Sequence, residues 1–439
     1  MSIEKKLDGI FVDPRTKTPL KVNWSGDALV VDDVEYSLTG NVAELGAPVR
    51  QSGQGDDLSP ELRAAHDAAF EDASESGGNI YGSLFDMPAI TQAGHYRRMA
   101  LLDEIPIGDV SGSVVVDFGT GPWGFAAIYP RLASAELCIG FDVSGVACRT
   151  AVTETSTEAL DRTVYATSDG EVIPLADDSV DVFFGGEVIE HVRNPLVFMQ
   201  EVARVCKDGA HVVLTTPNRD ALPYLLAGEP YATGPEHTAL MSVPEFRDVL
   251  SRFSTEIALT GYDTSMAPGA DEVPLDAALI DAIQLRATNY PELATGVISH
   301  SRIDKGLYRA NKIDWALKEL TWQSEEVKIA GASQVVSLFP GVSGLSIEDL
   351  TTVEVPCDGN VPVLMFWGHD WSGHVEIVRG ESVWVRDLFL RGAGFVRVEL
   401  PAVDGAIGPI KIRKAGTKAD RSASDEVIFY KLLDYTRND

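Results

Sequence analysis

The sequence has few of the features that mark disulfide-rich, zinc-binding or membrane-spanning proteins. Its 439 residues include four cysteines, and their spacing suggests neither a zinc ribbon nor a disulfide framework. Cys138 and Cys206 lie in apolar patterns, so we expect them to be buried thiols. No apolar run approaches the roughly 18 residues of a membrane span, and no hydrophobic signal region follows the first charges. We therefore expect a cytoplasmic protein.

Basic residues are also scarce. The chain has 36 Lys and Arg against 66 Asp and Glu, which gives a formal net charge of -30. A field of this sign repels nucleic acid and anionic membranes, so we expect neither as a partner. Hydrophobic residues make up 45% of the chain, which excludes a largely disordered protein. The length predicts two or three domains.

Residues 114–124 are the most informative stretch of the sequence. Three consecutive valines predict a strand buried on both faces, and Asp117 and a turn with Gly119 and Gly121 follow at once. A strand, a glycine turn and a helix build a ligand site at the carboxyl edge of an α/β sheet. A second short strand ends at Asp142, at the spacing where a carboxylate binds ribose hydroxyls. No Lys-Ser or Lys-Thr closes the loop, which disfavours a phosphate loop.

From here the chain resembles the class I S-adenosylmethionine (SAM) methyltransferases with a type 11/23-like core. Residues 168–184 look like that family's third and fourth strands, and 187–192 and 207–218 look like its next two elements. The resemblance covers about residues 81–260, with the motifs in family order. It implies a Rossmann-like, doubly wound α/β core that binds SAM. We expect the strands of this sheet at residues 114–118, 137–142, 163–167, 180–185 and 210–215. A later strand is expected at 253–261.

The same resemblance implies which residues contact the cofactor. Asp142 would accept hydrogen bonds from both ribose hydroxyls, because an ionised carboxylate has two acceptor oxygens, and Asp169 would bind the adenine amino group. Asp117 would help to position the glycine loop and the amino group of the methionine part of SAM. The alternative is that these are turn and cap residues only. The implied contacts are Asp117, Gly119, Thr120, Gly121, Asp142, Val143, Ser168, Asp169, Gly170 and Glu187.

Acidic residues and a histidine follow the fourth strand. If a helix begins there, Glu187, Glu190 and His191 share one face of it. His237 adds a fourth ligand, and carboxylates with imidazole suit Mg²⁺ or Mn²⁺. The pattern resembles two groups of metal-dependent O-methyltransferases, one acting on the 3′-terminal ribose of small RNAs and one on catechol-like ubiquinone precursors. There a metal would bind adjacent oxygens of a diol and lower the pKa of the attacked hydroxyl.

The pattern Glu-His-Val after this strand is also common in methyltransferases without a metal. In that case His191 or His237 is the candidate general base, because a histidine can titrate near neutral pH. Glu190 completes the set of catalytic candidates. The sequence leaves both alternatives open.

The two ends of the chain lie outside the resemblance. The first 50 residues, with short strands predicted at 9–14, 28–31 and 34–38, resemble the small Trm112-type module. Asp13 and Thr16 replace the two cysteines that would flank its proline, so we expect no metal there. We predict helices at 60–72 and 88–104, with Tyr81, Tyr96 and Arg97 either covering the cofactor or simply packed. The predicted division is a Trm112-like module without its cysteines (1–50), a linker and helix (51–80), the methyltransferase core (81–265), a helical extension over the acceptor site with helices at 277–283 and 315–320 (266–330), and an accessory all-β sandwich with evenly spaced strands (331–439).

One stretch of the accessory region, residues 367–374, combines tryptophan and histidine with small polar residues. Aromatic faces beside polar side chains can stack sugar rings, although packing at the edge of the sandwich is the favoured interpretation.

Together these features predict a SAM-dependent O-methyltransferase of a sugar, glycan or other polyhydroxylated small molecule, with a divalent metal as an optional aid. One alternative is a metal-independent methyltransferase of a phenolic or secondary metabolite. Another is a SAM-binding scaffold without catalysis. The outer domains are the expected place for a protein partner or a second copy of the chain.

Overall fold

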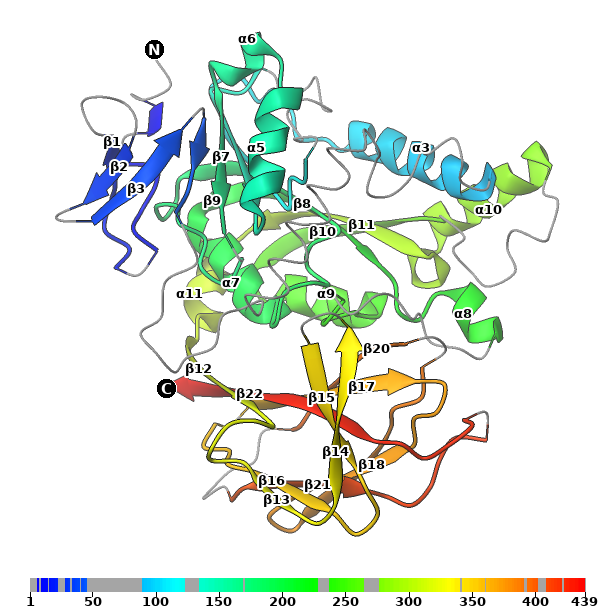
Figure 1. The fold of residues 1–439 in the computed structure, drawn as a ribbon. Helices are drawn as coiled ribbons and strands as arrows, with labels where there is room; N and C mark the ends of the chain where they lie inside the picture. The colour runs from blue at the N-terminus through cyan, green and yellow to red at the C-terminus, as the bar shows by residue number, and fades with distance from the viewer. Residues whose placement is uncertain are drawn as a thin grey trace. The chain divides into compact units, whose positions relative to one another are not determined.

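The structure is a computed structural model (Figure 1). It describes residues 6–7, 9–14, 16–22, 28–31, 34–39, 41–45, 89–122, 134–168, 170–227, 237–263, 276–339, 342–359, 361–390, 393–401, 408–420 and 422–438. By their contacts the residues form two compact units. The first comprises residues 1–49, 63–227 and 240–312, and the second comprises 50–62, 228–239 and 313–439. The predicted linker, the predicted helix at 60–72, Tyr81 and Asp169 lie outside the described residues.

The first unit is built on a mixed sheet whose centre is parallel. The strands predicted from apolar runs are confirmed as β5 (Val114–Phe118), β6 (Leu137–Asp142), β7 (Thr163–Thr167), β8 (Val180–Gly186) and β9 (Cys206–Pro217), and the later one as β10 (Ser254–Tyr262). A strand that was not predicted, β11 (Gly296–Ile303), pairs antiparallel with both β9 and β10. The order along the sheet is β7-β6-β5-β8-β9-β11-β10. The doubly wound α/β core is therefore confirmed.

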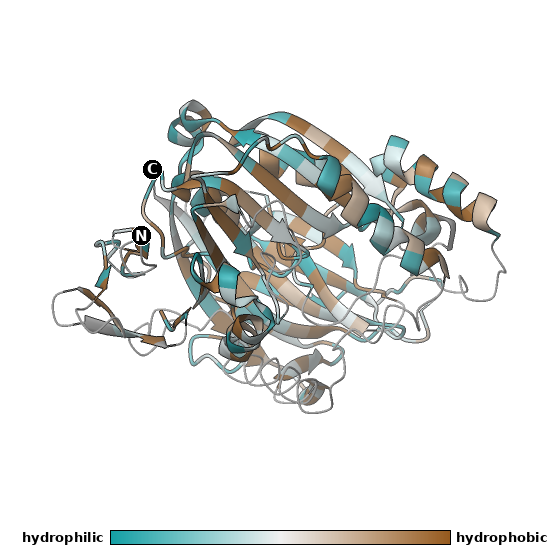
Figure 2. Ribbon diagram, turned by 90° about the horizontal axis from the view of Figure 1, so that it is seen from above, coloured by the Kyte–Doolittle hydropathy of each residue, from teal (hydrophilic) through white to brown (hydrophobic). Residues whose placement is uncertain are grey.

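Helices cover both faces of this sheet, as the run of valines in β5 predicts. Val116 packs in one apolar cluster with α7 (Pro195–Val205) and α9 (Val243–Ser251), while Val115 packs in another with α3 (Ala89–Glu104). The helix α10 (Ala277–Asn289) packs against α3 and β10. Figure 2 shows runs of apolar residues along many of the strands. The helices predicted at 88–104 and 277–283 are confirmed as α3 and α10. The remaining helical segments of the unit are α5 (Gly145–Glu154), α6 (Thr157–Leu160), α8 (Leu222–Ala227), η4 (Pro291–Leu293) and α11 (Lys305–Asn311).

The N-terminal strands extend this sheet. The predicted strands at 28–31 and 34–38 are present as β2 (Ala28–Val31) and β3 (Val34–Thr39), beside β1 (Lys21–Val22) and β4 (Val42–Ala43). Because β4 pairs in parallel with β7, the sheet runs unbroken through both regions, and the described residues before 46 belong to the first compact unit. The strand predicted at 9–14 is wrong: only isolated bridges occur there, from Phe11 and Val12.

Hydrogen bonds hold the N-terminal turn at the position where Trm112-type modules carry cysteines. Asp13 is buried, and its carboxylate accepts one bond from the Thr16 backbone N–H at 3.0 Å and one from the Tyr36 hydroxyl at 2.9 Å. A buried carboxylate with two donors is well satisfied. The turn is therefore organised by one side chain.

The helix predicted at 315–320 is wrong. These residues lie in strand β12 (Asp314–Thr321), which pairs antiparallel with β22 (Ile428–Asn438). Ala, Leu, Lys and Glu favour helices, but propensity is a weak prior that tertiary pairing overrides. The cross-strand pairing outweighs the helix propensity. For example, the Glu319 carboxylate on β12 accepts a hydrogen bond from Lys431 Nζ on β22 at 2.8 Å. Instead of a helical extension over 266–330, the region completes the first unit and begins the second.

The described residues of the second unit form strands and turns, in agreement with the β-structure predicted for 331–439. Its strands form two antiparallel sheets that share one apolar core, to which Phe366 and Phe429 contribute from one sheet and Ile377 and Ile412 from the other. The first sheet contains β12, β14 (Ser333–Phe339), β15 (Val342–Ile347), β17 (Val361–His369), β20 (Ala393–Glu399) and β22. The second contains β13 (Lys328–Ala330), β16 (Thr352–Val355), β18 (His374–Arg379), β19 (Ser382–Asp387) and β21 (Ile410–Lys414).

All four cysteines are buried and free, which confirms the expectation for Cys138 and Cys206. Burial raises the pKa of the Cys138 and Cys357 thiols to about 12 in each case. Thiols with such pKa values are poor nucleophiles near neutral pH. Among the described helices, none is both long and apolar enough to cross a bilayer.

We expect Asp13→Ala to lower the free energy of unfolding by about 1–3 kcal/mol, because it leaves the Thr16 N–H and the Tyr36 hydroxyl without their acceptor. Thr18→Ala in the same turn is the control, since Thr18 is exposed and its change should stay within about 0.5 kcal/mol. Urea unfolding followed by circular dichroism measures both. Equal stability of the two variants would contradict the role given to Asp13.

Candidate active site

The strand order reverses between β5 and β8, and this is where a doubly wound sheet opens a crevice for a ligand. Gly119 and Gly121 follow β5 and both have positive φ, +75° and +59°. The backbone N–H groups of Gly119 and Thr120 donate to the Phe141 carbonyl at 2.8 and 2.9 Å. A Cβ on Gly119 would lie 3.2 Å from the Val188 side chain, which follows β8. Glycine at this position therefore lets the two strand ends approach closely.

Asp142 ends β6 beside the glycine turn. Its carboxylate accepts hydrogen bonds from the N–H groups of Gly121 at 3.0 Å and Ser144 at 2.9 Å. These two bonds orient the carboxylate at the end of β6. Ser144 then caps α5, its hydroxyl accepting from the Ala147 N–H at 3.1 Å. Asp142 is half-buried, as is Val143 next to it.

The other expected cofactor residues lie at the same edge of the sheet. Asp117 and Thr120 are buried at the end of β5. Ser168 follows β7, and its hydroxyl donates to the Val172 carbonyl at 3.1 Å and accepts from the Gly170 N–H at 3.4 Å. Gly170 has φ +84°, and a Cβ there would lie 3.1 Å from the Phe198 ring. The tight loop that should hold the adenine is thus formed by backbone that only glycine adopts easily.

Glu187 does not take the place predicted for it. Residues 187–194 are turns and bends, so Glu187, Glu190 and His191 do not share a helical face. Glu187 itself has φ +52°, an uncommon conformation for a residue with a side chain. Its carboxylate turns to other partners, accepting hydrogen bonds from Thr215 Oγ1 at 2.6 Å and the Tyr262 hydroxyl at 2.9 Å.

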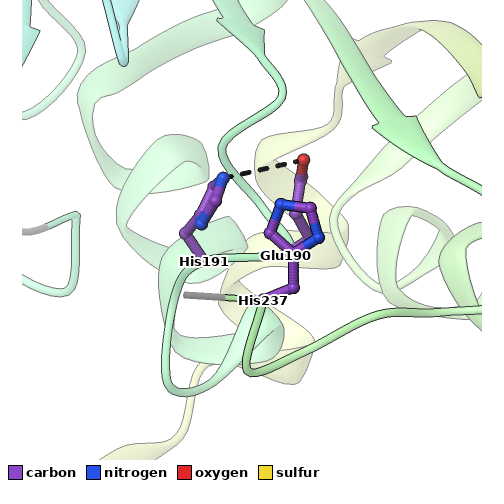
Figure 3. Close-up of side chains that lie close together, drawn as sticks. All are labelled: Glu190, His191 and His237. Carbon is purple, nitrogen blue, oxygen red and sulfur yellow. Dashed lines mark ion pairs between the residues drawn. The ribbon is translucent and has the colours of Figure 1, made fainter. Parts of the chain in front are cut away.

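Glu190, His191 and His237 form a group instead (Figure 3). Each offers one ligand atom, and these atoms lie within 4.8 Å of one another. His191 Nε2 is 3.9 Å from Glu190 Oε1, the pair marked by the dashed line in Figure 3. Of the four predicted metal ligands the structure therefore brings together three, and Glu187 is not among them.

Glu190 is the most unusual carboxylate of this region. Its side chain is 0% exposed, and Oε2 accepts one hydrogen bond from Thr216 Oγ1 at 3.1 Å. Oε1 is buried and has no hydrogen-bond donor in the described part of the chain. Burial and the nearby negative charge of Glu187 raise the pKa of Glu190 well above its ordinary value. Burial of a carboxyl oxygen without a donor lowers the stability of the fold. Carboxyls with perturbed pKa values cluster at active sites, where function can explain why such a group is kept.

Two residues near Glu187 were missed by the sequence analysis. Arg98 on α3 lies 3.7 Å from the Glu187 carboxylate and 5.8 Å above the centre of the Tyr262 ring. Tyr262 is buried, and this burial, with the charge of Glu187, raises the pKa of its hydroxyl. Arg98 and Tyr262 are far apart in the sequence, so no local sequence pattern indicates that they lie beside Glu187.

The residues predicted to cover the cofactor lie elsewhere: Tyr96 is exposed, and Arg97 donates a hydrogen bond to Thr288 Oγ1 on α10 at 3.3 Å.

The family comparison covers the region that contains this site. Residues 116–214 match the family model described as a methyltransferase domain. The match begins within β5 and ends within β9, so it contains the glycine turn, Asp142 and Glu190. The core of the chain is a class I SAM-dependent methyltransferase domain.

Individual relatives cover only part of the chain. A malonyl-[acyl-carrier protein] O-methyltransferase of Marinomonas sp. (strain MWYL1) is 31% identical over 154 residues, 35% of this chain and 52% of that protein. An uncharacterized methyltransferase of Mycobacterium sp. (strain JLS) is 29% identical over 158 residues, 36% of this chain and 57% of that protein. The chain therefore spans about half the length of these curated relatives. A solved complex of the Haloferax volcanii Trm112 methyltransferase activator with a proposed methyltransferase has 18% identity and a TM-score of 0.38, covering 54% of this chain and 97% of that one.

The residues of the methyltransferase domain fit SAM. The glycines leave space where a Cβ would contact Val188 or Phe198, and two N–H groups orient the Asp142 carboxylate beside the glycine turn. Asp142 would hold the ribose, and the backbone at Gly119 to Gly121 would lie against the methionine part.

We expect Asp142→Asn to raise the dissociation constant of SAM about 10- to 100-fold, because the amide offers one acceptor oxygen in place of two charged ones. Isothermal titration calorimetry with SAM measures the effect. Asp161→Asn, at an exposed cap of α6, is the matched control and should bind as the wild type does. Unchanged affinity in Asp142→Asn would contradict the ribose contact.

Proposed function

We propose that the protein transfers a methyl group from SAM to a hydroxyl oxygen of a sugar or other polyhydroxylated small molecule. The observation that carries the proposal is the pair Glu190 and His191, in which a buried carboxylate lies next to an imidazole that is 34% exposed. The pair follows directly after Val188, the residue that contacts the glycine turn. SAM supplies a methyl group on a positively charged sulfur. The protein then has to align the acceptor oxygen and remove its proton.

The pair is suited to hold that proton. The exposed imidazole of His191 can receive it from the acceptor hydroxyl, since histidine changes charge near neutral pH. Glu190 Oε1, 3.9 Å from His191 Nε2, stabilises the positive imidazole or takes the proton in turn. The raised pKa of Glu190 strengthens its affinity for a proton. No comparable help is needed for an amine acceptor that is already neutral.

Two further points bear on the acceptor, one on its reacting atom and one on its charge. The Marinomonas relative is named as an O-methyltransferase. The chain's net charge of -30 favours a neutral or cationic acceptor over an anionic one. A sugar or polyol is neutral and offers several hydroxyls.

A second candidate is the same transfer assisted by Mg²⁺ or Mn²⁺, because Glu190, His191 and His237 offer one oxygen and two nitrogen ligands within 4.8 Å. A divalent ion bound there would lower the pKa of an acceptor hydroxyl. These ions take about six ligands, so three protein donors leave positions for acceptor oxygens or water.

We expect Glu190→Gln to lower kcat about 10²- to 10⁴-fold while the dissociation constant of SAM stays within about twofold. The amide keeps the shape of the side chain but cannot carry the charge or the proton. Transfer of a labelled methyl group from SAM to fractionated polar metabolites and glycans measures kcat, and calorimetry measures SAM binding. Glu154→Gln, exposed at the end of α5, is the control. If no fraction is methylated although SAM binds, the protein is a SAM-binding scaffold and the proposal is wrong.

Chelation separates the two candidates. If a divalent ion takes part, EDTA abolishes the transfer and added Mg²⁺ or Mn²⁺ restores it, whereas SAM binding is unchanged. Transfer that EDTA leaves unaltered assigns the proton to the Glu190–His191 pair alone, and His191→Asn should then lower kcat as strongly as Glu190→Gln does.

A further inference from the structure

The turn between β17 and β18 places two tryptophans in opposite environments. Trp367 is 7% exposed, and its ring packs edge-on against Phe395 with centroids 5.2 Å apart. Trp371, four residues later, is 60% exposed. Packing at the edge of the all-β unit therefore accounts for Trp367 alone. An exposed indole forgoes the stabilisation that burial of its large apolar surface would give.

The exposure of Trp371 does not come from a loose turn. Its backbone N–H donates to His369 Nδ1 at 3.1 Å, and its carbonyl accepts from the Glu426 N–H at 3.0 Å. The Ser372 N–H donates to the His369 carbonyl at 3.0 Å, and the Ser372 side chain accepts from the His369 N–H at 2.9 Å. The backbone under the indole is thus fixed on both sides. A ligand that binds a fixed side chain loses less affinity to ordering it.

Polar groups of fixed orientation border the indole. Because His369 Nδ1 accepts a hydrogen bond, its Nε2 carries the hydrogen, and Nε2 lies 3.1 Å from the Glu426 carboxylate. The His369 ring stands edge-on to Trp371, with centroids 6.1 Å apart and planes at 85°. The Glu426 side chain is half-buried. One of its oxygens faces His369 and the other accepts a hydrogen bond from the Ser346 hydroxyl at 3.1 Å, which leaves acceptor positions beyond these two.

We propose that Trp371, with His369 and Glu426, forms a binding site for a neutral saccharide ring on the second unit. One face of a pyranose ring is a layer of C–H groups, which matches the negative face of an indole. The rim of the ring carries hydroxyls, which can donate to the Glu426 carboxylate. The acidic neighbourhood favours a neutral sugar over a phosphorylated or acidic one. The proposal concerns binding alone and does not depend on methyl transfer by the first unit.

The surroundings of Trp371 favour a sugar over a protein partner. Protein interfaces bury a contiguous apolar centre, whereas the exposed apolar residues of the neighbouring strand β19 lie away from this turn. His374, at the turn, pairs with Asp387, while Val385 pairs with Glu376 and Val383 pairs with Val378. Two and four residues along a strand separate the last two pairs from the turn by roughly 7 and 13 Å. Among the described residues of this unit, Trp371 is therefore the one exposed large aromatic side chain, and His369 and Glu426 beside it are polar.

The test uses the full chain and a panel of hexasaccharides of glucose, mannose, galactose and N-acetylglucosamine, measured by calorimetry. We expect at least one to bind, Trp371→Ala to weaken that binding about tenfold or more, and Trp371→Phe, which keeps an aromatic face, to weaken it less. Glu426→Gln should weaken binding by a smaller factor. Val383→Ala, an exposed apolar change on the same unit, is the matched control and should bind as the wild type does.

SAM binding should be the same in all these variants, and circular dichroism spectra that match the wild type report that the mutated second unit is folded. The proposal is overturned if no member of the panel binds with a dissociation constant below about 10 mM, or if Trp371→Ala binds the sugar as tightly as the wild type. Self-association of the chain that Trp371→Ala abolishes would also overturn it, because the indole would then belong to an interface between copies.

Discussion

The close approach of Gly119 to Val188 is the constraint on which the methyltransferase domain depends. The two residues follow β5 and β8, the strands between which the order of the sheet reverses. A side chain at Gly119 would push the ends of these strands apart. The same contact sets the place of the glycine turn on one side and of Glu190 and His191 on the other. The glycine turn and the Glu190–His191 pair are therefore positioned by one packing contact.

A second constraint is electrostatic. Glu187 and Glu190 lie close enough for the charge of one to raise the pKa of the other, yet they are satisfied in different ways. Glu187 turns to Thr215, Tyr262 and Arg98, at the cost of a positive φ. Glu190 stays buried with a single donor to Oε2. Environments that separate the proton affinities of two carboxylates are a general way to obtain one structural and one reactive group.

The sequence predicts the parallel strands well because each is a short apolar run between turns, and burial on both faces imposes that pattern. It predicts less well where distant pairing decides. Residues 315–320 have helical propensity but pair with β22, and the cysteine-free module continues the core sheet through Val42 and Tyr165. The motif Glu-x-x-Glu-His indicates the right region of the site, but not that Glu187 turns away. Arg98 and Tyr262 reach Glu187 from elements that only the fold brings together.

The parallel pairing of β4 with β7 has a consequence for folding and solubility. Without β4, strand β7 would end the sheet with unpaired N–H and C=O groups, which invite pairing with other chains. The N-terminal strands cover that edge, but Val42 must wait for Tyr165 to be synthesised before it can pair. Contacts over such a sequence distance slow folding, so the newly made N-terminal strands remain without their partner while the first half of the core emerges.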